Sequence, residues 1–291
     1  MLSDRLRSTE VQRTERAIET LGNVPWAKPV LARLRRAGGI KPENMPLMFE
    51  VRFAEELHRA GVTAEYEFPA GVGKSTVEFR LNTAPTWLIE LVSVRTSDAA
   101  RRATRQIGPL YFEQFFHPKP EDPGRSEEGE MITAEQKISE KVLSGRRPTK
   151  FPPRDGSLRL ILTDMRGYLD EGGKPEDYYE MAYGWRVLAR LSPDHWEVMV
   201  HRWTGQDGRV EPIKGLFEPR NPLAAAQLIR ERIHFLGFVK EEKFSDNEIR
   251  QMSLLLPNPE LFATQREVES AYSTYPLATL PILRSQLTRR G

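Results

Sequence analysis

The chain of 291 residues contains no cysteine. This absence excludes disulfide bonds, thiolate nucleophiles and cysteine-ligated zinc, and it is compatible with the reducing cytoplasm in which we predict the protein. The N-terminal segment is charged and lacks the apolar core of a secretory signal. No uninterrupted apolar run approaches the roughly 20 residues that a membrane-spanning helix needs. We therefore predict no membrane partner.

The chain also lacks an excess of positive or negative charge, because 43 basic residues are balanced by 41 acidic ones. The composition alone thus does not indicate nucleic-acid binding. Two local basic runs, at residues 101–105 and 145–150, are either solvated surface or phosphate contacts. The five histidines show no metal-ligand spacing, and no G-x-S-x-G pattern supports serine hydrolase chemistry.

Residues 68–81, FPAGVGKSTVEFRL, partly match a phosphate-binding loop. That pattern needs a glycine where Phe68 stands, and a helix after Lys74 whose N–H groups would hold the phosphate. The residues that follow, TVEFRL, alternate between apolar and polar, which is typical of a strand. We predict that PAGVGKS connects a hairpin and that the chain binds no nucleotide.

The order of the predicted elements indicates an α/β fold, with a mixed sheet flanked by helices. Residues 1–40 form a helical N-terminal extension, 41–256 the main domain and 257–291 a C-terminal tail. Helices are expected at 4–21, 26–36, 46–60, 133–143, 222–236 and 246–256, and strands at 63–69, 76–82, 86–94 and 158–163. Thr133 begins its helix with Gln136 in a capping-box arrangement.

Three glutamates stand in or beside apolar patterns. Helical spacing places Glu50 on one face with four apolar residues, namely Leu47, Phe53, Ala54 and Leu57. Glu90 lies in WLIELVSV, a strand that is apolar on both faces and is therefore expected in the centre of a sheet. Glu78 shares a strand face with Arg80. A carboxylate in an apolar environment is costly unless it is paired.

These glutamates are expected to meet, because two hairpins place Glu78 and Glu90 on neighbouring strands and the preceding helix packs Glu50 onto the same sheet. Three carboxylates suit Mg²⁺ or Mn²⁺, with water and phosphate oxygens completing the ligand set. Such a centre activates water for in-line attack on a phosphodiester.

The order helix, strand, strand, strand, helix, strand over residues 45–165 resembles the PD-(D/E)XK nuclease-like superfamily. The matching pieces are Glu50 in FEVRFAEEL, Glu78 in TVEFRL, Glu90 in WLIELVSV, and the helical segment AEQKISEKV. The resemblance implies a restriction-endonuclease-like core in which Glu50, Glu78 and Glu90 bind the metal. It also implies a nuclease acting on nucleic acid, with DNA placed ahead of RNA.

The sequence departs from this family at two positions. Glu78 stands where the family has aspartate, and Val92 occupies the place of the lysine that supports the attacking water. Some relatives carry that lysine on the following helix, where Lys137 and Lys141 stand one turn apart. Lys141 is the expected replacement, with Lys137 as the other lysine and Gln136 as a secondary candidate.

Two alternatives remain open. The same fold could lack catalysis and serve as a module that binds nucleic acid or protein, a hypothesis that Val92 favours. An unrelated α+β domain could instead pair all three glutamates with arginine. The sequence leaves the oligomeric state undetermined.

Overall fold

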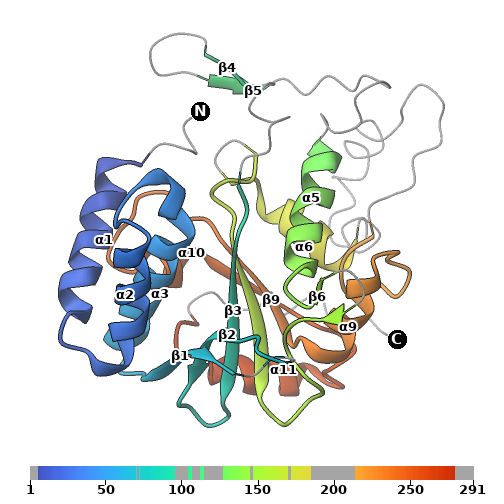
Figure 1. The fold of residues 1–291 in the computed structure, drawn as a ribbon. Helices are drawn as coiled ribbons and strands as arrows, with labels where there is room; N and C mark the ends of the chain where they lie inside the picture. The colour runs from blue at the N-terminus through green and yellow to red at the C-terminus, as the bar shows by residue number, and fades with distance from the viewer. Residues whose placement is uncertain are drawn as a thin grey trace.

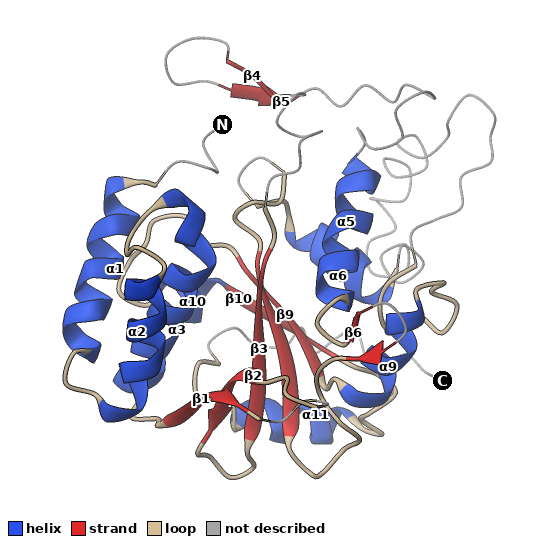
Figure 2. Ribbon diagram, viewed as in Figure 1, coloured by secondary structure: helices blue, strands red, loops and turns tan. Residues whose placement is uncertain are grey.

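A six-stranded mixed sheet forms the centre of the molecule, and helices cover both of its faces (Figures 1 and 2). The computed structural model describes residues 6–69, 71, 73–95, 104–106, 112–114, 127–144, 147–169, 172–184 and 214–278. Within them the predicted fold class, an α/β fold whose mixed sheet is flanked by helices, is confirmed.

The strand order in the sheet is β1-β2-β3-β8-β9-β10. The strands are β1 (Ala64–Phe68), β2 (Val77–Leu81), β3 (Trp87–Ser93), β8 (Leu158–Asp164), β9 (Phe235–Val239) and β10 (Ser253–Pro257). β1, β2 and β3 form an antiparallel meander, β3, β8 and β9 run parallel, and β10 returns antiparallel to β9. The predicted strands at 63–69, 76–82, 86–94 and 158–163 are confirmed. PAGVGKS connects β1 to β2, so the predicted hairpin is confirmed as well.

Two short pairs of strands lie outside this sheet. They are β4 (Thr104–Gln106) with β5 (Phe112–Gln114), and β6 (Leu143–Ser144) with β7 (Arg147–Pro148).

One face of the sheet is covered by N-terminal helices and by α10 (Figure 1). These helices are α1 (Ser8–Leu21), α2 (Lys28–Arg36), α3 (Met45–Arg59) and α10 (Glu248–Met252), with 3₁₀ turns at Pro25–Ala27 and Pro42–Asn44. Apolar residues of α1, α2 and α3 share one core with β2, β3 and β8. The described part of residues 1–40 is therefore helical and packs on the same core as the sheet.

The opposite face is covered by α5 (Glu127–Ser139), α6 (Pro175–Tyr183) and α9 (Ala224–Arg232), which pack over a second core. A further helix, α11 (Gln265–Ser273), packs Val268 and Ala271 into the first core, so the tail beyond residue 257 contains regular structure. Among the described residues, no helix is both long enough and apolar enough to cross a membrane.

Three helix predictions need correction. α5 begins at Glu127 and ends at Ser139, so Thr133 lies inside the helix, and its hydroxyl donates to the carbonyl of Gly129 (2.8 Å) instead of capping the start. The helices expected at 222–236 and 246–256 are shorter, because their last residues form β9 and β10. Short apolar runs such as FLGFV do not distinguish a buried strand from a helix by periodicity, and β9 is buried throughout.

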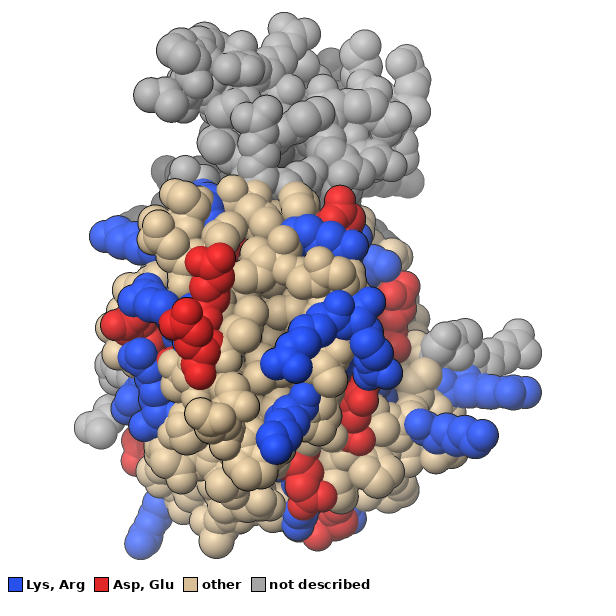
Figure 3. Space-filling model, turned by 60° about the vertical axis from the view of Figure 1, so that its left-hand side comes forward, with Lys and Arg blue, Asp and Glu red and all other residues tan. Residues whose placement is uncertain are grey.

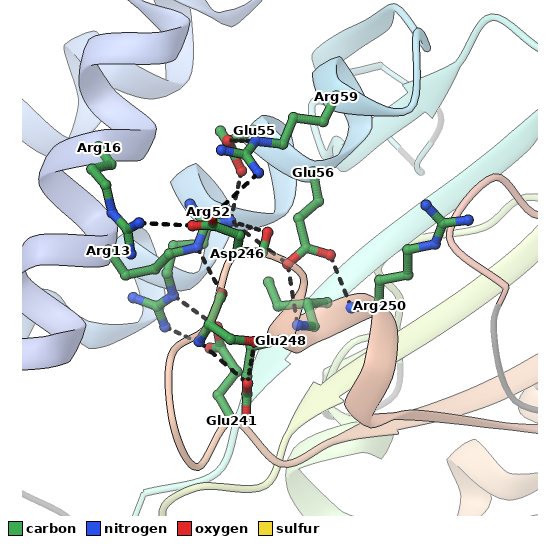
Figure 4. A network of polar contacts seen from close by, with 12 residues as sticks. Arg13, Arg16, Arg52, Glu55, Glu56, Arg59, Glu241, Asp246, Glu248 and Arg250 are labelled. Carbon is green, nitrogen blue, oxygen red and sulfur yellow. Dashed lines mark hydrogen bonds and ion pairs between the residues drawn. The ribbon is translucent and has the colours of Figure 1, made fainter.

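A buried ionic network fastens α1 and α3 to the segment between β9 and α10 (Figure 4). The guanidinium of Arg52 donates to both carboxylate oxygens of Glu241 (2.9 and 2.6 Å) and contacts Glu10 (3.4 Å). Arg13 donates to Glu55 (2.6 Å) and to the carbonyl of Ser245 (3.1 Å). Because these side chains are buried, each charge depends on its partners for compensation.

Candidate active site

A cleft of about 760 Å³ opens beside the ends of β2 and β3, between the start of α3 and the end of α5. Its lining carries acidic and basic side chains together, namely Arg33, Glu43, Glu50, Glu78, Arg95, Lys137, Glu140 and Lys141. Glu90 is fully buried and joins the cleft through its ion pair with Lys141. Among the predicted site residues, Glu50, Glu78, Lys137 and Lys141 thus line one cleft.

Glu78 and Glu90 form a carboxyl pair on neighbouring strands. The register pairs Phe79 with Ile89, so its continuation places Glu78 opposite Glu90. The two carboxyl groups are close enough to share a hydrogen bond. One oxygen of Glu78 also accepts the backbone N–H of Leu91 (3.1 Å), which fixes the orientation of the pair.

Two lysines compensate this pair. The ammonium of Lys141 lies 2.8 Å from Glu90 Oε1 and 3.7 Å from Glu78 Oε1. Lys150 pairs with the same oxygen of Glu90 and lies 3.6 Å from Glu78 Oε1. Lys141 follows α5 in a turn, and Lys150 follows β7, so the two lysines approach from different segments. Lys141 therefore contacts the carboxyl pair from a position two residues beyond α5, whereas the predicted helix at 133–143 would have included it.

The two carboxyl groups of the pair have opposite pKa shifts. Burial raises the pKa of Glu90 well above its usual value, and the neighbouring Glu78 raises it further. Burial would also raise the pKa of Glu78, but the hydrogen bond with Glu90 and the two lysines lower it. A proton shared by the pair is therefore favoured on Glu90 over Glu78.

Glu50 belongs to a separate hydrogen-bond system on the wall of the cleft. The hydroxyl of Tyr66 donates to Glu50, and Arg33 donates to both Tyr66 (2.7 Å) and Glu50 (3.4 Å). Burial raises the pKa of Glu50 to about 7, although Arg33 lowers it. The nearby charge of Glu78 raises this pKa as well, so Glu50 lies within electrostatic reach of the carboxyl pair.

The other two predicted residues lie further from the pair. Lys137 lines the cleft and pairs with Glu140 (3.3 Å) on the surface of α5. Gln136 is exposed and does not line the cleft. The structure therefore brings together Glu78, Glu90 and Lys141, with Glu50 and Lys137 in the same cleft and Gln136 outside it.

The donor set suits a divalent cation only in part. In the portion of the chain that the structure describes, no three acidic or histidine side chains are arranged as a metal-ion site. Mg²⁺ is commonly bound by one or two carboxylates, with water and substrate phosphate as the remaining ligands. The Glu78–Glu90 pair alone could supply those carboxylates. Glu90 Oε2 is buried and receives no hydrogen-bond donor from the described residues, so a shared proton or a cation would satisfy it. The predicted Mg²⁺ or Mn²⁺ stays a prediction.

Sequence reasoning missed Lys150, Arg33 and Tyr66 as members of this site. Lys150 ends the basic run at 145–150, which did signal candidate phosphate contacts. Arg33 and Tyr66 lie on different elements and share no local pattern. The alternative in which all three glutamates pair with arginine is wrong, because Glu50 pairs with Arg33 whereas Glu78 and Glu90 pair with lysines.

No protein-family model matches this chain, and neither does any curated protein or any solved structure. The site must therefore be interpreted from its own geometry.

Proposed function

We propose that this protein is a metal-dependent phosphodiesterase that hydrolyses nucleic acid. The observation that carries the proposal is the buried Glu78–Glu90 pair, compensated by two lysines at an open cleft. A protein gains no obvious stability from two adjacent buried carboxyl groups, and perturbed acids of this kind gather at functional sites.

The element order supports a restriction-endonuclease-like core. α3, β1, β2, β3, α5 and β8 occur in the same order as in the superfamily named above, with the short strands β4 to β7 between them, and β8 lies parallel to β3. Glu50 comes from the helix, Glu78 from the second strand and Glu90 from the third. Lys141, just after the second helix, takes the role that Val92 cannot fill.

Glu78 and Glu90 would hold the metal, and Glu50 is the candidate third ligand from the cleft wall. When bound, the cation would lower the pKa of a coordinated water and neutralise charge on the phosphate. Glu78 and Glu90 would coordinate the metal in their ionised forms, and protons compete with the metal for these oxygens. Metal affinity should therefore fall as pH decreases.

The basic side chains of the chain have separate roles in this proposal. Lys141 and Lys150 place positive charge beside the carboxyl pair, where negative charge develops on the phosphate during attack. Arg33, Arg95 and Lys137 line the cleft and would contact phosphates along the bound strand. Figure 3 shows both basic and acidic side chains scattered over one face of the molecule. Binding would therefore depend on the cleft rather than on a uniform field.

A non-catalytic module that binds nucleic acid or protein is the second candidate. The favouring observations are Val92 at the usual lysine position and the two ammonium groups that already compensate the pair. In such a module the lysines would replace the cation permanently, and the cleft would bind phosphates without cleaving them.

A cleavage panel separates the two candidates. Purified protein is incubated with single- and double-stranded DNA and RNA, in Mg²⁺, in Mn²⁺ and in chelator, with DNA as the first substrate. We expect cleavage only in the presence of metal. Salt-dependent binding without cleavage of any substrate would overturn the nuclease and support the module.

A further inference from the structure

The connection between β1 and β2 contacts the segment that carries Lys150. The hydroxyl of Ser75 donates to the carbonyl of Thr149, and Gly71 forms an antiparallel bridge with Lys150. This connection is the PAGVGKS segment that partly matches a phosphate-binding loop. Its serine and its first glycine are therefore used within the protein.

Thr149 joins this contact to the second lysine. Its backbone N–H donates to the carbonyl of Val142 (2.9 Å), and its hydroxyl donates to the carbonyl of Lys141 (2.9 Å). One residue thus connects the β1–β2 connection, the Lys150 segment and the turn that carries Lys141. The geometry of both lysines depends on Thr149, and Ser75 holds Thr149 from the other side.

Gly71 leaves no room for a side chain at this contact. A Cβ at this position would lie 1.8 Å from Ser75 Oγ and 2.9 Å from the Ser75 carbonyl oxygen. The second clash involves backbone, so an alanine must displace the connection itself. Lys74, by comparison, is exposed in the same connection.

We propose that the β1–β2 connection is a positioning element that holds Lys150 against the Glu78–Glu90 pair, with Ser75 and Gly71 as its positioning residues. A lysine has a long flexible stem and reaches one place reliably only when its backbone is fixed. The backbone of Lys150 forms a β-bridge with Gly71, and the preceding carbonyl, that of Thr149, accepts a hydrogen bond from Ser75. The inference rests on the proposed phosphodiesterase for its catalytic consequence but not for the placement of Lys150.

The first test measures placement without requiring activity. Competitive acetylation followed by mass spectrometry compares the reactivity of each lysine in the wild type, Ser75→Ala, Ser75→Thr and Gly71→Ala. The side chain of Lys150 is 19% exposed and ion-paired, so it should react slowly in the wild type. Ser75→Ala and Gly71→Ala should raise its reactivity at least about twofold, because the segment opens more often. Ser75→Thr keeps the hydroxyl and should restore the wild-type value.

The second test measures the consequence for catalysis. Ser75→Ala should lower kcat about 10- to 100-fold with little change in KM, because the lysine is misplaced while the substrate contacts remain. Lys74→Ala is the matched control from the same connection and should keep the wild-type kcat.

The outcomes of the two tests are distinguishable. Unchanged reactivity of Lys150 in both Ser75→Ala and Gly71→Ala overturns the positioning role, whatever the activity. Raised reactivity in a protein whose wild type cleaves nothing overturns the proposed function and supports the placement of Lys150. Raised reactivity with an unchanged kcat overturns the catalytic consequence.

Discussion

Replacing Arg52 with methionine tests the buried network of Figure 4. The guanidinium is fully buried, donates twice to Glu241, donates to Thr14 (3.1 Å) and lies over the ring of Phe244 (5.1 Å). Methionine keeps part of the apolar stem but leaves Glu241 without its bidentate partner. Removing one member of a buried ion pair costs about 3–5 kcal/mol of folding free energy. In a chain of this size that corresponds to a fall in Tm of roughly 6–15 °C.

The cost of Arg52→Met should also depend on pH. Burial raises the pKa of Glu241 and Arg52 lowers it, so the variant raises this pKa further. A carboxyl group with a raised pKa in the folded state contributes stability at low pH and loses it as pH rises. The variant should therefore be less damaged at pH 5 than at pH 8.

The assay is urea denaturation of Arg52→Met, Glu241→Gln and the double variant. The double variant should lose less free energy of unfolding than the two single variants lose together, and the difference should be about 0.5–3 kcal/mol. Arg16→Met is the matched control, because Arg16 pairs with Asp246 at 2.8 Å while both side chains are about half exposed. Its cost should stay below about 1 kcal/mol. If Arg52→Met costs no more than Arg16→Met, the network does not fasten α1 and α3 as argued.

Three further predictions concern other parts of the molecule. Burial raises the pKa of Glu56 from 4.5 to about 8, so the stability that this group contributes is complete below about pH 4.5 and is lost as pH rises through 8. Between these pH values, the free energy of unfolding of Glu56→Gln should rise relative to that of the wild type by up to about 1.4 kcal/mol per pH unit. Parallel curves in pH-dependent denaturation would contradict this. A Cβ at Gly237 would lie 2.6 Å from a methyl group of Leu162, so Gly237→Ala should cost about 1–3 kcal/mol in the same assay, and an unchanged Tm would refute the tight packing of β9. Lys141→Ala should slow cleavage more than it weakens Mn²⁺ binding, because the lysine stabilises charge without coordinating the metal; an equal loss in both measurements would contradict that role.

The sequence identifies the first half of the sheet because its signals are local. Glu90 interrupts a strand that is apolar on both faces, which predicts both a central strand and an unusual carboxylate. Alternation in TVEFRL predicts β2 and corrects the resemblance to a phosphate-binding loop. These patterns need no information from distant residues.

The rest depends on tertiary contacts that no local pattern encodes. β9 and β10 are strands because each is buried beside a partner strand, whereas the periodicity of FLGFV and SLLLP alone does not distinguish strand from helix. Lys150 reaches Glu90 across 60 residues of sequence. Tyr66 and Arg33 meet Glu50 only when α2, α3 and β1 are packed together.

The comparison that tests the carboxyl pair most directly is single-turnover cleavage of labelled DNA in Mn²⁺ by the wild type, Glu90→Gln and Glu65→Gln. Glu65 lies on β1, outside the cleft lining, and receives the same substitution. If Glu78 and Glu90 form the catalytic centre, Glu90→Gln should lose activity about 100-fold or more while remaining folded, and Glu65→Gln should keep the wild-type rate. Equal cleavage by the wild type and Glu90→Gln would contradict the assignment of this pair as the active site.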